Sequence, residues 1–185
     1  VCLILGDNIF HGPIGLENEV STFEAGAVIW GYPVSDPQRY GVIEIDDSGS
    51  VLSIEEKPAV PRSEFAVPGL YLYDSTAVSR AKELVPSGRG ELEITDLNLS
   101  FLRDGELRAV KLGRDTTWLD SGTHESLLES SNFVASVEKE HGYKVACLEE
   151  VAYKMGFVSV DEVAKTLESM PPSPYRAYCE RAILG

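Results

Sequence analysis

The chain has 185 residues, of which 43% are apolar and 25% charged, and these are ordinary values for a globular protein. Its 30 acidic and 16 basic side chains give a net charge of −14, which repels nucleic-acid backbones and anionic membrane surfaces. Composition therefore argues against disorder, a nucleic-acid partner and a membrane partner. It still allows a small phosphorylated substrate, because a divalent cation and a few basic side chains can reverse the field inside one cleft.

Three widely spaced cysteines, Cys2, Cys147 and Cys179, form no C-x-x-C or other metal-ligand spacing. Reduced thiols are the simplest interpretation, so we expect a cytoplasmic protein. The apolar opening at 1–5 is far shorter than a signal-peptide core or than the ~20 apolar residues that cross a membrane. Because the chain opens with Val1 in what resembles a buried strand, we expect a fold that is truncated at its N-terminus.

The first elements predict an α/β crossover. The continuous apolar run at 1–5 favours a strand buried on both faces, 13–24 favours a helix, and 27–34 is a second apolar, β-branched strand. Strand, helix and strand in this order predict parallel pairing.

Antiparallel strands follow. The runs 42–46 and 51–55 are separated by Asp47-Ser48-Gly49, whose glycine can take the left-handed conformation of a tight hairpin. The run 65–73 is interrupted by Pro68-Gly69, which suggests a bulge where backbone approaches a ligand. The sheet is therefore expected to be mixed.

The later part of the chain is richer in helices. An apolar face predicts a helix at 93–103, a strand follows at 107–112, and a long helix runs from 123 to about 141 and stops at Gly142.

Short helices begin near residue 145, and the clearest of them carries a capping box formed by Ser159 and Glu162. We therefore expect one domain at 1–145 and a helical extension at 146–185.

Two aspartates stand where open α/β sheets bind ligands. Asp7 follows a predicted strand, and Asp120 precedes a helix, with Gly122 allowing close backbone approach. A turn or capping role would explain either residue alone. Together they could share one Mg²⁺, which typically takes one or two carboxylates and completes its shell with phosphate oxygens and water.

Two basic residues could contact a phosphate. Lys57 ends a strand beside Glu56, which could accept hydrogen bonds from sugar hydroxyls, and Pro58 is expected to hold Lys57 in extended backbone. Arg89 lies between two glycines in a second basic loop. A solvated strand end and a helix-entry loop explain these residues as well.

Gly41 could bring backbone amides against a small ligand, with Tyr40 as a wall, although a plain turn explains this pair equally well. None of the three histidines combines with Cys or Ser at a spacing that predicts a nucleophilic triad. Nothing near the start of the chain matches a glycine-rich phosphate loop.

Six motifs follow one another along the chain: Gly6-Asp7-Asn8-Ile9-Phe10, Arg39-Tyr40-Gly41-Val42, Ile54-Glu55-Glu56-Lys57-Pro58, Gly69-Leu70-Tyr71-Leu72-Tyr73-Asp74, Gly90-Glu91-Leu92-Glu93-Ile94-Thr95-Asp96 and Trp118-Leu119-Asp120-Ser121-Gly122-Thr123-His124-Glu125. In this order they strongly resemble the glucose-1-phosphate thymidylyltransferases, which are sugar nucleotidyltransferases. The resemblance is strongest over 1–135. It implies a Rossmann-like α/β nucleotidyltransferase fold with a mixed, mostly parallel central sheet and a helical C-terminal appendage.

The resemblance also implies the activity. Such enzymes join glucose 1-phosphate to dTTP with Mg²⁺ as cofactor, release pyrophosphate, and deliver dTDP-glucose to deoxysugar synthesis; a homo-oligomer is expected. This chemistry depends on in-line positioning and charge neutralisation more than on acid or base catalysis.

The resemblance assigns site residues in three groups. The metal ligands would be Asp7 and Asp120, and the catalytic contacts to the sugar phosphate would be Lys57 and Arg89. The remaining substrate-binding residues would be Asn8, Tyr40, Gly41, Glu56, Val67 and Trp118. A second, regulatory nucleotide site is implied near Arg114, Glu149 and Glu150.

The family's glycine-rich loop and base-recognition residues would precede Val1, so we expect this chain to be inactive alone. Two alternatives remain at this point. One is a metal-dependent glycosyltransferase that uses a finished nucleotide sugar, and the other is a non-catalytic subunit or regulatory remnant.

Overall fold

The computed structural model describes residues 1–46, 48–88 and 90–185, and the chain divides into two compact units, Val1–Leu128 and Glu129–Gly185. This boundary falls inside the helix His124–His141. The sequence predicts a domain boundary at residue 145, where the short helices begin, and that boundary stays a prediction.

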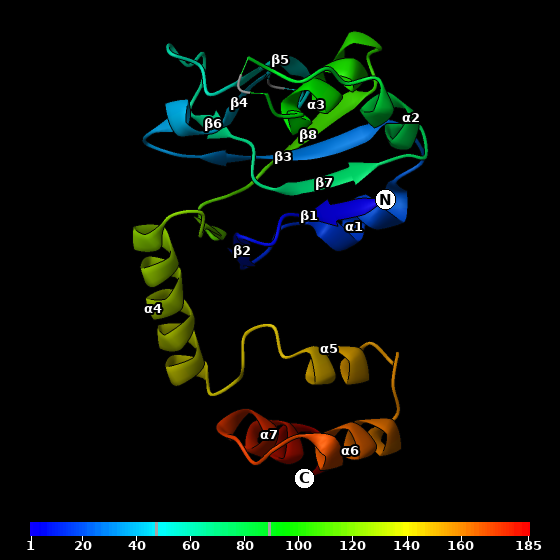
Figure 1. The fold of residues 1–185 in the computed structure, drawn as a ribbon, viewed down its shortest axis with the longest axis vertical. Helices are drawn as coiled ribbons and strands as arrows, with labels where there is room; N and C mark the ends of the chain where they lie inside the picture. Colours follow the sequence, from blue (N-terminus) through cyan, green and yellow to red (C-terminus); the bar gives the residue numbers. More distant parts are fainter. Residues whose placement is uncertain (47, 89) are drawn as a thin grey trace. The chain divides into compact units, whose positions relative to one another are not determined.

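The first unit alternates strands with short helices, and its ribbon is drawn in Figure 1. The elements are β1 (Cys2–Ile4), β2 (Asn8–His11), α1 (Leu16–Thr22), β3 (Ala27–Pro33), the 3₁₀ helix η1 (Pro37–Arg39), β4 (Gly41–Ile45), β5 (Val51–Glu56), β6 (Phe65–Ala66), β7 (Leu70–Tyr73), α2 (Ala77–Lys82), α3 (Ile94–Arg103), β8 (Leu107–Lys111), β9 (Thr117–Asp120) and the start of α4 (His124–His141).

Strand β3 is the centre of the main sheet, whose order is β1-β7-β3-β6-β4-β5, with β8 also paired to β3. Residues 27–29 of β3 pair with β7 and residues 32–33 with β6, both antiparallel, while β8 runs parallel to β3. The predicted β4–β5 hairpin is confirmed, and Gly49 in its turn has a left-handed φ of 86°. Asp47 of that turn lies outside the described residues.

Helices cover the two faces of this sheet. Because successive side chains of a strand point to opposite faces, Ile29 of β3 packs with Phe101 of α3, whereas Val28 and Trp30 pack on the other face with Leu16 of α1. Figure 1 shows α2 and α3 on one side of β3 and α1 on the other. The result is a layered α/β unit, as predicted.

Three expectations about the sheet are wrong. Among the described strands, the β3–β8 pair is parallel and the remaining pairs are antiparallel, so the sheet is mixed but not mostly parallel. Strands β1 and β3 do run in the same direction, but β7 lies between them because β1 pairs with β7. β1 is also not buried, since its three residues are exposed, Leu3 to 37% and Ile4 to 55%.

The interruption at Pro68-Gly69 divides the predicted strand into β6 and β7 in place of a bulge within one strand, and the backbone there comes close to another part of the chain. A Cβ at Gly69 would lie 2.8 Å from Asn8 Nδ2 and 2.7 Å from the Leu5 side chain. Glycine therefore lets the β6–β7 connection contact the segment that leads into β2.

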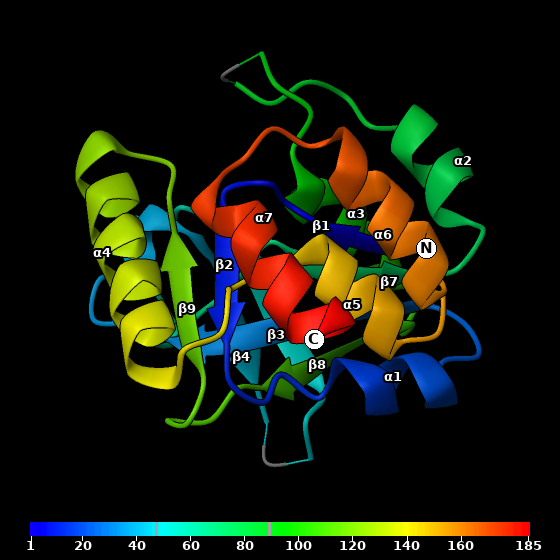
Figure 2. The same ribbon diagram turned by 90° about the horizontal axis from the view of Figure 1, so that it is seen from below.

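A separate two-stranded ribbon joins β2 to β9 (Figure 2). Its antiparallel register sets Asn8 opposite Asp120 and His11 opposite Thr117. Neither four-residue strand was predicted from the sequence, and neither was α2.

The second unit continues α4 and adds α5 (Leu148–Lys154), α6 (Val160–Ser169), α7 (Pro174–Cys179) and the π-helical turn η2 (Glu180–Leu184). The predicted capping box is confirmed, because Ser159 Oγ accepts from the Glu162 backbone and Ser159 N donates to Glu162 Oε2 at 2.8 Å. Val163 and Leu167 of α6 are buried in its small core. Within the described ranges, no helix has both the length and the apolar character that crossing a membrane requires.

Candidate functional site

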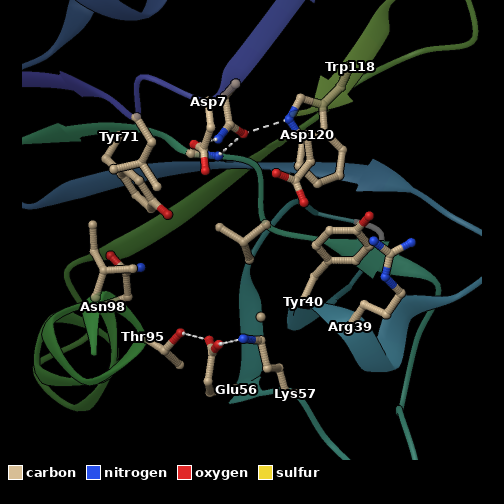
Figure 3. A pocket seen from close by; sticks show the side chains of 16 residues that line it. Asp7, Arg39, Tyr40, Glu56, Lys57, Tyr71, Thr95, Asn98, Trp118 and Asp120 are labelled. Atoms are coloured by element: carbon tan, nitrogen blue, oxygen red, sulfur yellow. Dashed lines mark hydrogen bonds and ion pairs between the residues drawn. The ribbon is translucent and has the colours of Figure 1, made fainter. Parts of the chain in front are cut away.

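A pocket of about 210 Å³ in the first unit gathers side chains from the main sheet, the β2–β9 ribbon and α3 (Figure 3). Its lining includes every described residue that the sequence assigned to a metal or to a sugar phosphate, namely Asp7, Asn8, Tyr40, Gly41, Glu56, Lys57, Val67, Trp118 and Asp120. The remaining residue of that set, Arg89, lies outside the described residues. The fold thus brings these positions together, while their individual roles stay predictions.

Asn8 links two walls of the pocket. Its Oδ1 accepts hydrogen bonds from the Gly69 backbone at 2.9 Å and from Trp118 Nε1 at 2.6 Å. Its Nδ2 donates to Asp7 Oδ1 at 2.7 Å. One amide therefore fixes the indole ring and one metal-ligand candidate.

Asp7 and Asp120 face a common space. The ribbon pairs Asn8 with Asp120, and Ser121 N donates to the Asp7 carbonyl at 2.7 Å. A Cβ at Gly122 would lie 3.1 Å from Asp120 Oδ1 and 3.7 Å from Asp7 Oδ2. Two carboxylates turned toward the space that glycine leaves open are a donor set that fits a hard divalent cation such as Mg²⁺.

Glu56 is held for hydrogen bonding on the opposite wall. Thr95 Oγ1 donates to Glu56 Oε2 at 2.6 Å, and the β4–β5 ladder pairs Glu56 with Gly41. A Cβ at Gly41 would lie 3.2 Å from Glu56 Oε2 and 3.3 Å from Thr95 Oγ1. A larger residue at position 41 would therefore press on this carboxylate, and the Gly41 carbonyl accepts from Val67 N at 2.8 Å.

The prediction of extended backbone at Lys57 is wrong, because its φ is 44°, in the left-handed region. Its amide donates to the Tyr40 carbonyl at 3.0 Å, and this bond holds the chain in that conformation just past the end of β5. A non-glycine residue there costs roughly 1–3 kcal/mol. The Lys57 ammonium lies 3.9 Å from Glu56 Oε1 and is half exposed at the pocket.

Aromatic rings form a third wall. Tyr40 meets the Trp118 indole edge-on, with ring centroids 5.1 Å apart. Tyr32 also packs edge-on against the Trp118 indole, with ring centroids 5.7 Å apart. The Arg39 guanidinium lies 5.3 Å from the Tyr40 centroid and is 2.9 Å from Asp36.

Several lining residues were not assigned a role from the sequence: Leu5, Arg39, Gly69, Tyr71, Ile94, Thr95 and Asn98. Burial, followed by the negative charges of Glu56 and Asp7, raises the pKa of the Tyr71 phenol, so it stays a protonated donor at neutral pH. The sequence does contain a feature that marks Thr95 and Asn98. They are polar residues three apart on α3, and both are buried beside its apolar face.

Comparison with known proteins supports this geometry. A family model described as nucleotidyl transferase matches residues 1–137, which contain the whole pocket. The chain belongs to this family. Nucleotidyl transferases typically depend on a divalent metal ion, in agreement with the facing carboxylates.

Individual relatives are consistent with the family. The chain is 46% identical over 180 residues to the glucose-1-phosphate thymidylyltransferase of Neisseria gonorrhoeae, and 46% identical over 180 residues to that of Mycolicibacterium smegmatis. Each match covers 96% of this chain and 62% of the relative, so the chain spans less than two thirds of their length.

Solved structures confirm the predicted nucleotidyltransferase fold. A Bacillus anthracis protein assigned as a glucose-1-phosphate thymidylyltransferase, in complex with a sucrose, matches with TM-score 0.63 and 44% identity over 71% of this chain and 53% of that one. A UDP-glucose pyrophosphorylase complexed with UDP-glucose matches with TM-score 0.61 over 75% of this chain and 56% of that one; at 22% identity it supports the fold alone.

The residues predicted for a regulatory nucleotide site belong to different units. Arg114 lies between β8 and β9, while Glu149 and Glu150 lie on α5. Within the second unit, Glu149 accepts from the Tyr175 hydroxyl, and Glu150 accepts from Lys154 at 2.5 Å and from the Tyr178 hydroxyl. The regulatory site stays a prediction.

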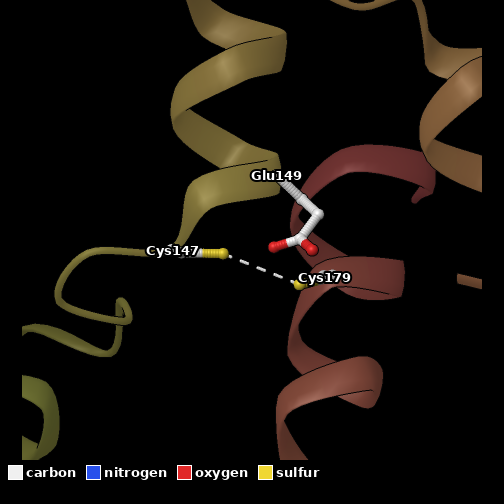
Figure 4. A group of neighbouring side chains, drawn as sticks. All are labelled: Cys147, Glu149 and Cys179. Carbon is white, nitrogen blue, oxygen red and sulfur yellow. Dashed lines mark hydrogen bonds between the residues drawn. The ribbon is translucent and has the colours of Figure 1, made fainter. Parts of the chain in front are cut away.

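A cysteine cluster lies in the core of the second unit (Figure 4). The sulfurs of Cys147 and Cys179 are 3.6 Å apart, and with a Glu149 carboxylate oxygen they lie within 4.8 Å of one another. Burial raises the pKa of the Cys179 thiol, and both cysteines pack with Val163 and Leu167 in the apolar core of this unit. We therefore interpret this pair as part of the core.

Replacing Gly122 with alanine should weaken Mn²⁺ binding about tenfold or more, because the added methyl would stand between the Asp7 and Asp120 carboxylates. Electron paramagnetic resonance of free Mn²⁺ measures this affinity. Gly6→Ala is the matched control, since a Cβ at Gly6 meets nothing within 4 Å. Equal affinities in the two variants would contradict the assignment of this space to a metal.

The thiols should differ in reactivity. Cys2 is exposed, whereas Cys147 and Cys179 are buried, so one thiol of the native chain should react quickly with a disulfide reagent and two should react only on unfolding. Absorbance of the released thiolate counts them, and Cys2→Ser should remove the fast phase. Two or more fast thiols would show that the second unit is open.

Proposed function

We propose that the protein is a glucose-1-phosphate thymidylyltransferase, which forms dTDP-glucose and pyrophosphate from glucose 1-phosphate and dTTP, and that this pocket binds glucose 1-phosphate and Mg²⁺. One observation carries the proposal. A single pocket combines two facing carboxylates, Asp7 and Asp120, with a cation, Lys57, and a held hydrogen-bond acceptor, Glu56. The curated relatives of this chain bear the same activity in their names.

The sugar would lie against Glu56 and the backbone of Gly41 and Val67. Sugar hydroxyls donate to a carboxylate, which Glu56 supplies. The Val67 amide already donates to the Gly41 carbonyl, so Gly41 and Val67 would contribute close backbone contact. Tyr40 and Trp118 offer the apolar ring faces that pack against the C–H groups of a hexose.

The phosphate would lie near Lys57, with Arg89 as a second contact. In a chain of net charge −14, a dianion needs this local positive charge. Asp7 and Asp120 would hold the Mg²⁺, which supplies further neutralisation of phosphate charge when bound.

The reaction joins a phosphate oxygen of glucose 1-phosphate to the α-phosphorus of dTTP. The bond between that phosphorus and the oxygen bridging to the β-phosphate breaks, and pyrophosphate leaves with the electron pair. The chain's own residues orient the attacking oxygen in line and offset its charge. Glu56 would help to orient the sugar, and Lys57 would offset the negative charge of the phosphate. Homo-oligomeric assembly and a cytoplasmic location belong to the same proposal.

Titration calorimetry with glucose 1-phosphate in the presence of Mg²⁺ tests the proposal. We expect saturable one-to-one binding that Lys57→Gln weakens about tenfold or more, because a charge-assisted contact is lost. Lys82→Gln removes the same charge from an exposed position on α2 outside the pocket and should leave binding unchanged. No saturable binding, or equal affinity for glucose 6-phosphate, would refute the assignment.

A further inference from the structure

Asn98 on α3 has an amide nitrogen that its surroundings do not use. The residue is 1% exposed, and its Nδ2 finds no hydrogen-bond partner among the described residues. A buried polar group without a partner destabilises the folded state, so such a group calls for a specific explanation.

The other end of this amide is fixed. The Tyr73 hydroxyl donates to Asn98 Oδ1 at 2.7 Å, and the Tyr73 ring stacks on Tyr71 and Phe101 with centroids 5.8 and 5.6 Å away. Burial raises the pKa of Tyr73, so the phenol keeps the proton that it donates in this bond. Asn98 Oδ1 accepts this hydrogen bond, which leaves the NH₂ group on the far side.

That far side is the pocket. Asn98 lines it together with Tyr71 and Thr95, and Figure 3 shows the nitrogen turned toward the pocket interior. Thr95 already donates its hydroxyl hydrogen to Glu56. On this face of α3, Asn98 is therefore the side chain that can donate to a ligand oxygen.

We propose that Asn98 Nδ2 donates a hydrogen bond to a hydroxyl group of the bound hexose, directly or through one ordered water, and so helps to select a sugar hydroxylated at that position. The inference rests on the proposed function and adds a specificity-determining residue to it. A hydroxyl can donate to the Glu56 carboxylate and accept from another group. Asn98 supplies the donor that complements Glu56 on the same wall.

The double variant Asn98→Leu with Tyr73→Phe tests the inference, because it removes both polar partners at nearly constant shape. The free protein should be as stable as wild type or more so, since no buried donor is left unpaired. Glucose 1-phosphate should bind about tenfold more weakly. Tyr73→Phe alone keeps the Asn98 donor and should retain binding within about twofold of wild type.

Singly deoxygenated glucose 1-phosphates identify the hydroxyl. The analogue that lacks the contacted group should bind wild type and double variant equally, whereas the other analogues should keep the tenfold difference. Unchanged binding of glucose 1-phosphate in the double variant overturns the inference. A fall in stability with unchanged binding also overturns it, because Asn98 would then be a structural residue.

If the double variant does not fold, a measurement on the wild-type chain tests the inference. The side-chain NH₂ resonances of Asn98 should shift and exchange more slowly with solvent when glucose 1-phosphate saturates the protein. Resonances that do not respond would overturn the inference. If wild type binds no glucose 1-phosphate, the proposed function itself fails before any variant is compared, and the inference fails with it.

Discussion

The pairing of β2 with β9 is the interaction on which the pocket depends. It joins two segments that are more than a hundred residues apart, and the hydrogen bond from Trp118 to Asn8 alone spans 110 positions. Because Asp7 directly precedes β2 and Asp120 ends β9, the antiparallel register sets both carboxylates at one end of the ribbon. A slip of one residue would turn the side chains of β9 to the other face and separate the carboxylates.

The carboxylates of this pocket repel a phosphate unless a cation is bound with them. Asp7, Asp120 and Glu56 converge on one pocket in a strongly acidic chain, and like charges at short range oppose one another. A divalent cation and Lys57 offset that repulsion and create a place for a phosphate dianion. The binding of metal and sugar phosphate should therefore be mutually favourable, and by linkage each should raise the affinity for the other by the same factor.

Elements with strong local signals could be predicted from the sequence, and elements fixed by distant partners could not. The β4–β5 hairpin and the α3 and α4 helices follow from turn glycines and periodic apolar residues. The four-residue strands β2 and β9 are too short to show a period, so the ribbon that unites Asp7 with Asp120 went unpredicted. The family motifs contain most of the pocket, but Asn98 lies just beyond the motif that ends at Asp96, and a polar residue in an amphipathic helix does not by itself indicate burial.

A crystal structure with Mn²⁺ and glucose 1-phosphate bound, analysed by anomalous scattering, tests the convergence of the two aspartates most directly. The account predicts one anomalous peak within bonding distance of carboxylate oxygens from both Asp7 and Asp120, next to the sugar phosphate. A peak coordinated by one aspartate alone, or a sugar phosphate bound with no peak beside it, would contradict it.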